Sequence, residues 1–280
     1  MSTTQPAWVA QGREFLEESK IDLAVSRLLS KSKDVGIKRR RLYHIQQALE
    51  KGVKSYIPAL LVGFRGVPKM VDYRMEFEKR LRSSTTATDI VKSRIEKLSG
   101  ELSTPKGLGH NPGQKLEMKE FVEDINLYLD LMEVPEEEAR PAKEALGTFD
   151  KGTVSDELAR IASAEENRKR VGEKSLKILE QERARVETPK ALLELANRVS
   201  FPIFLTSTVE MIYYLSLLSR LSRYEQACRY PGAGEVPEEL ILNIEVLEVR
   251  VQKMIGWITE FFDDSALVAL FDQMYFRSNG

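Results

Sequence analysis

Histidine is the scarcest of the residue types that could support metal or acid–base chemistry in this chain. Only His44 and His110 are present. A di-iron helical bundle needs Glu-x-x-His pairs on two helices, and Arg41 and Gly107 stand where the glutamates would have to be. The zinc-protease pattern HExxH is also missing. We therefore predict no metal site and no cofactor, and we expect His44 to be a surface or boundary side chain.

The other candidates for chemistry are a glycine-rich segment and the single cysteine. Residues 107–113, GLGHNPG, superficially resemble a phosphate-binding loop, but no strand precedes them and their spacing differs from the dinucleotide-binding fingerprint. We interpret them as a loop, with anion binding as the weaker alternative. Cys228 lies near Arg223 and Arg229, which would lower its pKa, yet no histidine is near it in sequence. A small core residue is the favoured interpretation of Cys228. We expect a non-enzymatic protein, and a helical enzyme whose carboxylates meet only in the fold stays a third alternative.

A cluster of basic residues is the clearest candidate for a functional site in the sequence. Four consecutive cations, residues 38–41, span about 400° of a helix and cannot share one face. We expect one or two of them to lie at the core boundary, with buried stems. The others could contact phosphates, whose binding is electrostatic and independent of base sequence. The candidate anion-contacting residues are Lys31, Lys33, Lys38, Arg39, Arg40, Arg41, Lys54, Arg65 and Lys69.

This basic cluster has two weaker or competing interpretations. It could be a solvated face, or a face paired with acidic groups within the protein. Tyr43, Tyr56, Phe64 and Tyr73 are interleaved with it and could stack on bases, although aromatic residues at helical spacing usually belong to a core. The pI of the whole chain, about 6.3, weakens the nucleic-acid interpretation.

Charge is unevenly divided along the 280-residue chain. Residues 1–82 hold 17 Lys and Arg against 9 Asp and Glu, whereas the remaining residues hold 25 against 34. Such asymmetry indicates an anionic partner for the basic part, or attraction between the two parts in the fold or in an assembly. Gly, Pro, Ser and Asn concentrate in residues 100–115. We therefore predict a basic helical region over 1–105 and an acidic helical bundle over 106–280.

The expected location is intracellular, in the cytoplasm or nucleus or in a bacterial cytoplasm. A single cysteine cannot form a disulfide within the chain. The first twenty residues lack the basic start and apolar run of a secretory signal. We expect a protein that is not secreted.

Helical periodicity recurs along the chain and strand alternation is nearly absent. The predicted fold is all-α, a multi-helix bundle with one large or two small helical domains. We expect helices that begin near Pro6 and near Ser19, and a third helix that stops at Gly52. The segment around Pro58 should hold only a short or broken helix.

Two further helix starts are predicted later in the chain. Thr153 and Asp156 predict a capping box, and Thr188 followed by Pro189 predicts the start of another helix. Residues 163–170, SAEENRKR, contain no large apolar residue. That stretch is predicted to be exposed to solvent or to project from the body.

The last third of the chain is the most apolar. A helix is expected to end near Asn197, and residues 201–221 are long enough to cross about 30 Å of hydrocarbon. Glu210 in their middle disfavours membrane insertion and favours the central helix of a bundle. A heptad seam follows, which predicts a bundle core or an oligomer seam. It comprises Leu240, Ile244, Leu247, Val251, Met254, Ile258 and Phe261.

Together these patterns predict a non-enzymatic helical interaction or assembly protein. Its partner would be another protein or a second copy, with the basic part of one copy against the acidic part of another in a homo-oligomer. The alternative is a nucleic-acid-binding helical protein, nucleoprotein-like or regulatory, that contacts phosphates through residues 31–41.

Overall fold

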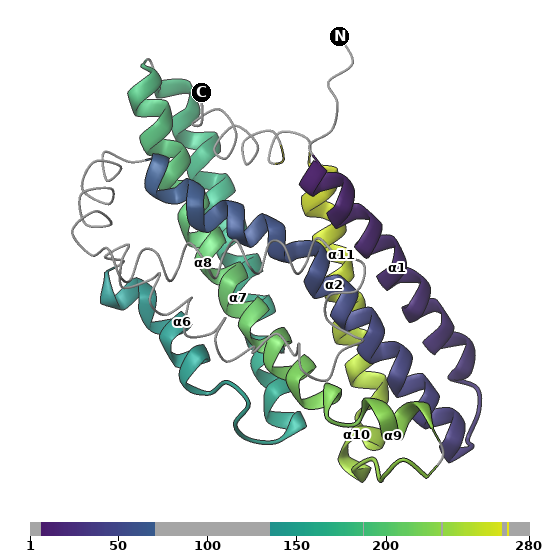
Figure 1. The fold of residues 1–280 in the computed structure, drawn as a ribbon. Coiled ribbons are helices and arrows are strands. Elements are labelled where there is room, and N and C mark those ends of the chain that lie inside the picture. Colours follow the sequence, from purple (N-terminus) through teal and green to yellow (C-terminus); the bar gives the residue numbers. More distant parts are fainter. Residues whose placement is uncertain (1–6, 71–134, 187, 231, 265–267, 269–280) are drawn as a thin grey trace, which may run out of the picture. The chain divides into compact units, whose positions relative to one another are not determined.

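The computed structural model describes residues 7–70, 135–186, 188–230, 232–264 and 268. These residues form eight α-helices and one short 3-10 turn, and none of them is in a strand (Figure 1). The predicted all-α class is therefore confirmed. The predicted domain boundary within residues 100–115 lies outside the described residues.

The helices of the described ranges have the following bounds in chain order. They are α1 (Ala7–Leu29), α2 (Val35–Met70), α6 (Glu136–Gly147), α7 (Val154–Glu182), α8 (Pro189–Ser222), α9 (Glu225–Arg229), α10 (Glu238–Leu242) and α11 (Ile244–Asp263), with the 3-10 turn Arg183–Arg185 between α7 and α8.

Two compact units alternate along the chain. Unit 1 comprises Met1–Ala59, Thr148–Glu165 and Tyr213–Leu270. Unit 2 comprises Leu60–Gly147, Glu166–Ile212 and Phe271–Gly280. The helices α2, α7 and α8 therefore contribute one end to each unit.

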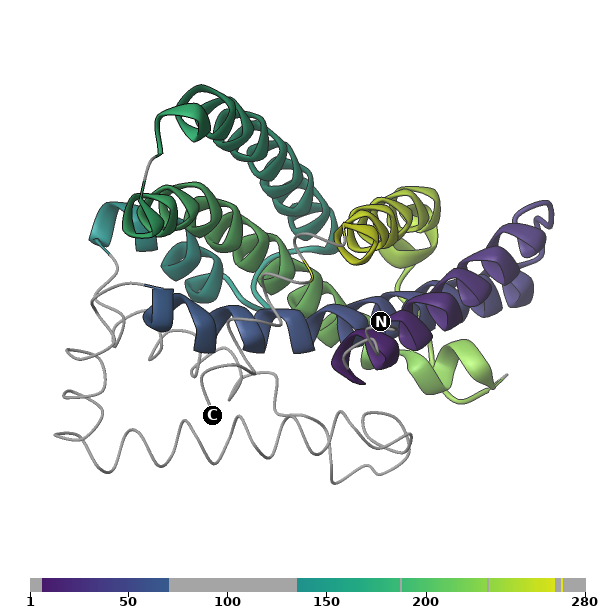
Figure 2. The same ribbon diagram turned by 90° about the horizontal axis from the view of Figure 1, so that it is seen from above.

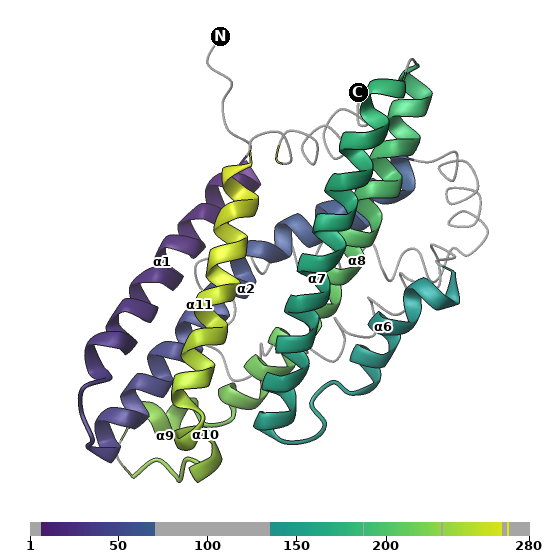
Figure 3. The same ribbon diagram turned by 180° about the vertical axis from the view of Figure 1, so that it is seen from behind.

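The core of unit 1 forms where α1, the first part of α2 and α11 pack together. The helices α1 and α11 lie side by side in opposite views (Figures 1 and 3). Every residue of the predicted heptad seam is buried, from Leu240 to Phe261, and the seam passes from α10 to α11 across Asn243. Within this chain the seam is therefore core of unit 1.

Small residues on α1 allow this close packing. The buried positions of α1 alternate in steps of three and four, as in a coiled-coil seam, and they are Val9, Gly12, Leu16, Ser19, Leu23 and Ser26. A Cβ atom added at Gly12 would lie 2.9 Å from the carbonyl oxygen of Ser55 and would collide with the ring of Phe262. Gly12 is thus needed for contact with both α2 and α11.

Two predicted helix boundaries in this region are wrong. No helix starts at Ser19, because its buried hydroxyl donates a hydrogen bond to the carbonyl oxygen of Ala48 at 2.6 Å, and α1 is one continuous helix. The helix α2 continues through Gly52, where the missing side chain makes room for Met254 of α11. It also continues past Pro58, so the predicted break is absent from α2.

The unit 2 portions of α7 and α8 form an antiparallel pair (Figure 2). Glu182 near the end of α7 pairs with Arg198, and farther from the turn Arg168 pairs with Glu210. Glu210 is fully buried. Its carboxylate in the apolar run therefore has a guanidinium partner on the neighbouring helix.

Polar residues of α7 face inward where exposure was predicted. Within residues 163–170, Glu165 is buried and binds Arg250 at 2.9 Å and Lys253 at 3.1 Å in unit 1. Arg168 is the partner of the buried Glu210 in unit 2. The prediction is wrong for these residues, because ion pairs replace apolar contacts on the inner face of the helix.

The start of α8 was predicted correctly and its end was not. The Thr188 hydroxyl accepts a hydrogen bond from the Ala191 N–H at 3.2 Å, as an N-cap does. The helix then continues beyond Asn197 to Ser222. Phe201–Ser222 is the one described helical stretch long and apolar enough to cross a membrane, and 72% of its most apolar 18 residues are buried inside the protein. Burial of this extent is typical of a core helix.

Candidate functional site

The turn between α1 and α2 holds its backbone in a defined shape. The carboxylate of Asp34 accepts a hydrogen bond from the Ile37 N–H at 3.0 Å and caps the start of α2. The Asp34 N–H donates in turn to the hydroxyl of Ser32 at 3.2 Å. Side chains that leave this turn are therefore carried by a fixed backbone.

Four of the predicted anion-contacting residues surround the turn. Lys31 and Lys33 lie in the turn itself and are exposed, and Arg40 is exposed one turn into α2. Lys38, between them, is half-buried. We call these four residues the basic corner. They come from ten consecutive positions.

Arg41 has a different role from its neighbour Arg40. Its side chain is only 6% exposed. The guanidinium donates to Glu248 at 2.9 and 3.2 Å and to Glu245 at 2.8 Å, which ties α2 to α11. Glu248 also accepts from the Ser26 hydroxyl at 2.7 Å, which adds α1 to the network. The expectation that part of the basic run lies at the core boundary is confirmed at Arg41.

The pKa of Glu245 reflects this network. Partial burial acts to raise the pKa, but hydrogen bonds from Arg41 and from the backbone, and the charges of Arg41 and Lys38, leave it below its ordinary value. The carboxylate is therefore held in its charged form beside the basic corner.

Of the other predicted residues, Arg39 is half-buried between Lys38 and Arg40 along α2, and Lys54, Arg65 and Lys69 lie farther along the same helix. Lys54 is buried, pairs with Glu50 at 2.7 Å and lies 5.8 Å from the centre of the Phe15 ring. Arg65 and Lys69 are on α2, and their side chains lie outside the described part of the structure. The structure therefore brings together residues 31–40 and separates Lys54 from them.

Two exposed aliphatic side chains flank the basic corner, and sequence reasoning missed them. Leu28, at the end of α1, is 79% exposed, and Val35, at the start of α2, is 58% exposed. The apolar spacing on residues 21–29 predicts Leu28 on an inward face. It faces outward because the buried seam of α1 uses Ser26 and Leu23 instead.

An arginine and two tyrosines lie near the start of α2. Arg229 of α9 lies 5.3 Å from the ring centre of Tyr43 and 5.2 Å from that of Tyr230. Tyr230 is 51% exposed. Tyr43 was named from the sequence as a stacking candidate, but Arg229 and Tyr230 were missed because they are distant from the basic cluster along the chain.

Cys228 is not an activated thiol. Burial raises its pKa to about 11, against the opposing charge of Arg39. The sequence neighbours Arg223 and Arg229 are engaged elsewhere, with Asp150 and with Glu225. The interpretation of Cys228 as a small core residue is supported, because a thiol with this pKa is almost entirely protonated at neutral pH.

His44 is a boundary side chain, as predicted. Its Nδ1 lies 2.9 Å from the carboxylate of Asp22, which also binds Lys51 at 2.8 Å. No group of three His, Cys, Asp or Glu side chains with metal-binding geometry occurs among the described residues.

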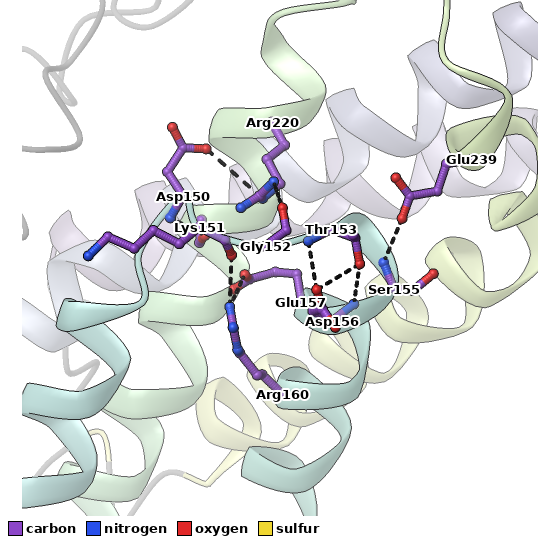
Figure 4. Close-up of polar contacts among 11 residues, drawn as sticks. Asp150, Lys151, Gly152, Thr153, Ser155, Asp156, Glu157, Arg160, Arg220 and Glu239 are labelled. Carbon is purple, nitrogen blue, oxygen red and sulfur yellow. Dashed lines mark hydrogen bonds and ion pairs between the residues drawn. The ribbon is translucent and has the colours of Figure 1, made fainter.

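A second polar cluster lies where the chain enters α7 (Figure 4). The predicted capping box is confirmed, because the Thr153 N–H donates to Asp156 at 2.8 Å and the Asp156 N–H donates to the Thr153 hydroxyl at 3.1 Å. Hydrogen bonds from the N–H and the hydroxyl of Thr153 to the carboxylate lower the pKa of Asp156. Glu157, the next residue, is fully buried and binds Arg160 at 3.2 Å.

Arginines of α8 hold the loop that precedes this helix. Asp150, which has a left-handed φ of 58°, pairs with Arg223, and its N–H donates to the Ser216 hydroxyl at 2.9 Å. Arg220 donates to the carbonyl oxygen of Gly152 at 2.7 Å (Figure 4). Positive and negative groups are balanced here, so the cluster fixes the loop on α8 and does not select an ion of one sign.

Comparison of the chain with protein-family models, with curated proteins and with solved structures found no match.

The basic corner is therefore the best candidate for a functional surface on geometric grounds. Three of its four cations are exposed, whereas the acidic and basic groups around Glu157 form ion pairs and hydrogen bonds within unit 1. A surface of exposed cations and aliphatic side chains supports binding through charge and apolar contact.

Proposed function

We propose that the protein is a non-enzymatic helical interaction protein that docks an acidic protein partner on its basic corner. The observation that carries this proposal is the combination at one turn of exposed Lys31, Lys33 and Arg40 with exposed Leu28 and Val35. A partner with carboxylates around an apolar patch would complement both features.

The aliphatic side chains favour a protein over a phosphate backbone. Protein interfaces combine an apolar centre with a polar rim, and Leu28 and Val35 could supply such a centre between the cations. Contacts to phosphates need cations and hydrogen-bond donors and gain little from exposed aliphatic groups.

Nucleic-acid binding is the second candidate, and one observation favours it. Tyr230 is half-exposed and stacked on Arg229, and proteins bind single-stranded nucleic acid by combining cations with aromatic platforms. Tyr43, which also contacts Arg229, lies one turn after Arg39 on α2.

Fluorescence polarisation with two labelled polyanions separates the candidates. The probes are poly-L-glutamate and single-stranded oligouridylate, each titrated with the full-length protein across a salt series. The test variant is K31E/K33E. The control is K174E/K177E, which reverses two exposed lysines on α7.

We expect poly-L-glutamate to bind at low salt and to lose about ten-fold or more in affinity with K31E/K33E, because like charges then face each other. The control should bind as the wild type does. Tighter binding of oligouridylate, with the same dependence on Lys31 and Lys33, would favour the second candidate. Equal binding by both variants would contradict the proposal for this surface.

A further inference from the structure

The start of α6 is an acidic surface within the described residues. Glu136, Glu137 and Glu138 occupy the first turn of this helix and are all exposed. Carboxylates stabilise the first turn of a helix, because they complement the unpaired N–H groups there. That effect accounts for acidic residues in this position but does not need three consecutive exposed ones.

Packing of α6 directs these glutamates outward. The helix buries its alanines, Ala139, Ala142 and Ala145, on one face. Pro135 immediately before the helix and Pro141 within it are both exposed. The start of α6 thus combines exposed carboxylates with exposed apolar rings.

The basic corner has the complementary composition. It combines exposed cations with the aliphatic side chains of Leu28 and Val35. Carboxylates of the α6 start can pair with the exposed cations of the corner, and its proline rings can contact the two aliphatic side chains, although the segment also carries one exposed cation, Arg140. The basic corner and the start of α6 therefore match in both charge and apolar contact. A basic face that only contacts solvent would not need exposed aliphatic side chains beside its cations.

We propose that the acidic partner is a second copy of this chain, which docks the start of its α6, residues 135–141, on the basic corner. The inference rests on the proposed function, because it names the partner of the same surface. In this proposal, the uneven charge along the chain drives self-assembly, because the basic part of one copy attracts the acidic part of another.

A contact between two unlike surfaces has a consequence for the size of the assembly. Each bound copy still presents a free basic corner or a free α6 start, so the contact propagates as an open chain or closes as a ring. Exposed ion pairs contribute little each and are screened by salt. The assembly should therefore grow with protein concentration and shrink as salt is added.

Sedimentation velocity of charge-reversed variants tests the proposal. One variant is K31E/K33E and the other is E136K/E137K. Each is measured alone and the two are measured as an equal mixture, at about 20 mM salt, where the Debye length is about 20 Å. The control mixture combines K174E/K177E with E173K/E180K, which change exposed residues on α7. Thermal melts confirm that every variant folds.

We expect the wild type and the controls to self-associate, and each test variant alone to associate about ten-fold or more weakly. The mixture of the two test variants should recover association, because the reversed corner of one then faces the reversed α6 of the other. Only a direct contact between these surfaces predicts that recovery.

Three results would overturn the inference, and they differ in what they leave of the proposed function. A wild type that stays monomeric at high concentration and low salt excludes the second copy, but binding of poly-L-glutamate to the corner would still support an acidic partner. Self-association that K31E/K33E weakens and E136K/E137K does not would keep the corner and exclude α6. Loss of both self-association and poly-L-glutamate binding removes both proposals.

Discussion

Replacement of Arg41 by methionine should destabilise the fold, whereas the same replacement at Arg40 should not. Arg41 makes three hydrogen bonds to Glu245 and Glu248 with a side chain that is 6% exposed. Removal of one partner from a buried ion pair costs about 3 to 5 kcal/mol, because the other charge is left buried.

The structure places the expected cost at the lower end of that range. Glu248 keeps the hydroxyl of Ser26 at 2.7 Å and the guanidinium of Arg27 at 3.5 Å. Glu245 is 71% exposed and can be solvated. We therefore expect Arg41→Met to lower the free energy of unfolding by about 3 kcal/mol, and Arg40→Met to change it by about 0.5 kcal/mol or less.

Urea denaturation followed by circular dichroism at neutral pH measures both changes. A double-mutant cycle of Arg41→Met with Glu248→Gln should give a coupling energy of about 1 to 3 kcal/mol. Equal costs for Arg40→Met and Arg41→Met would refute the division of the basic run into one structural and one exposed arginine. A coupling energy near zero would refute the contact with Glu248 as the cause.

Three further predictions concern the packing and the buried titratable groups. Gly12→Ala should destabilise the protein by about 1 to 3 kcal/mol through overpacking against Ser55 and Phe262. Gly172→Ala, where no atom lies within 4 Å of an added Cβ, should stabilise α7 by up to about 1 kcal/mol, and urea melts that give both changes the same sign would contradict this. Burial raises the pKa of Glu157, against the opposing charge of Arg160, so the stability it contributes is present below the ordinary glutamate pKa and is lost as pH rises through the raised value. The free energy of unfolding of Glu157→Gln, measured by urea denaturation, should therefore rise relative to that of the wild type as pH rises from about 4 to about 7. A difference between the two proteins that does not change with pH would rule out this linkage. Cys228, with a pKa of about 11, should have about one thiolate in 1,000 at pH 8 and should react slowly with a thiol reagent until the protein unfolds; rapid labelling of the native protein would contradict its burial.

Local hydrogen-bonding signals were readable from the sequence. The capping box of Thr153 and Asp156 and the N-cap at Thr188 were predicted from residue types at fixed short spacings, and both are present. These motifs depend on neighbours within one helical turn, so tertiary packing has little influence on them. The heptad seam from Leu240 to Phe261 was also readable, because its periodicity extends over several turns.

Predictions failed where distant residues decide the local structure. Gly52 has the residue type of a helix end, but its role is to admit Met254 from α11. Residues 163–170 look solvated, but Glu165 is buried because Arg250 and Lys253 approach it from α11. A sequence pattern assigns polar residues to the surface and cannot identify the partners that make their burial possible.

The candidate site was predictable in part. The helix geometry of residues 38–41 required that the cations divide between faces, and the structure assigns Arg41 to the core boundary and Arg40 to solvent. Which residue took which role depended on Glu248, more than 200 positions away. The exposure of Leu28 was not predictable, because the seam of α1 uses small and polar residues in place of the larger aliphatic ones.

The most direct test of the basic corner as a docking surface is lysine acetylation mapped by mass spectrometry, with and without saturating poly-L-glutamate. Exposed lysines react in proportion to their accessibility, so a bound polyanion protects those that it covers. We predict protection of Lys31, Lys33 and Lys38, and none of Lys174 and Lys177. Uniform protection of all five lysines, or protection of the α7 pair alone, would contradict the account.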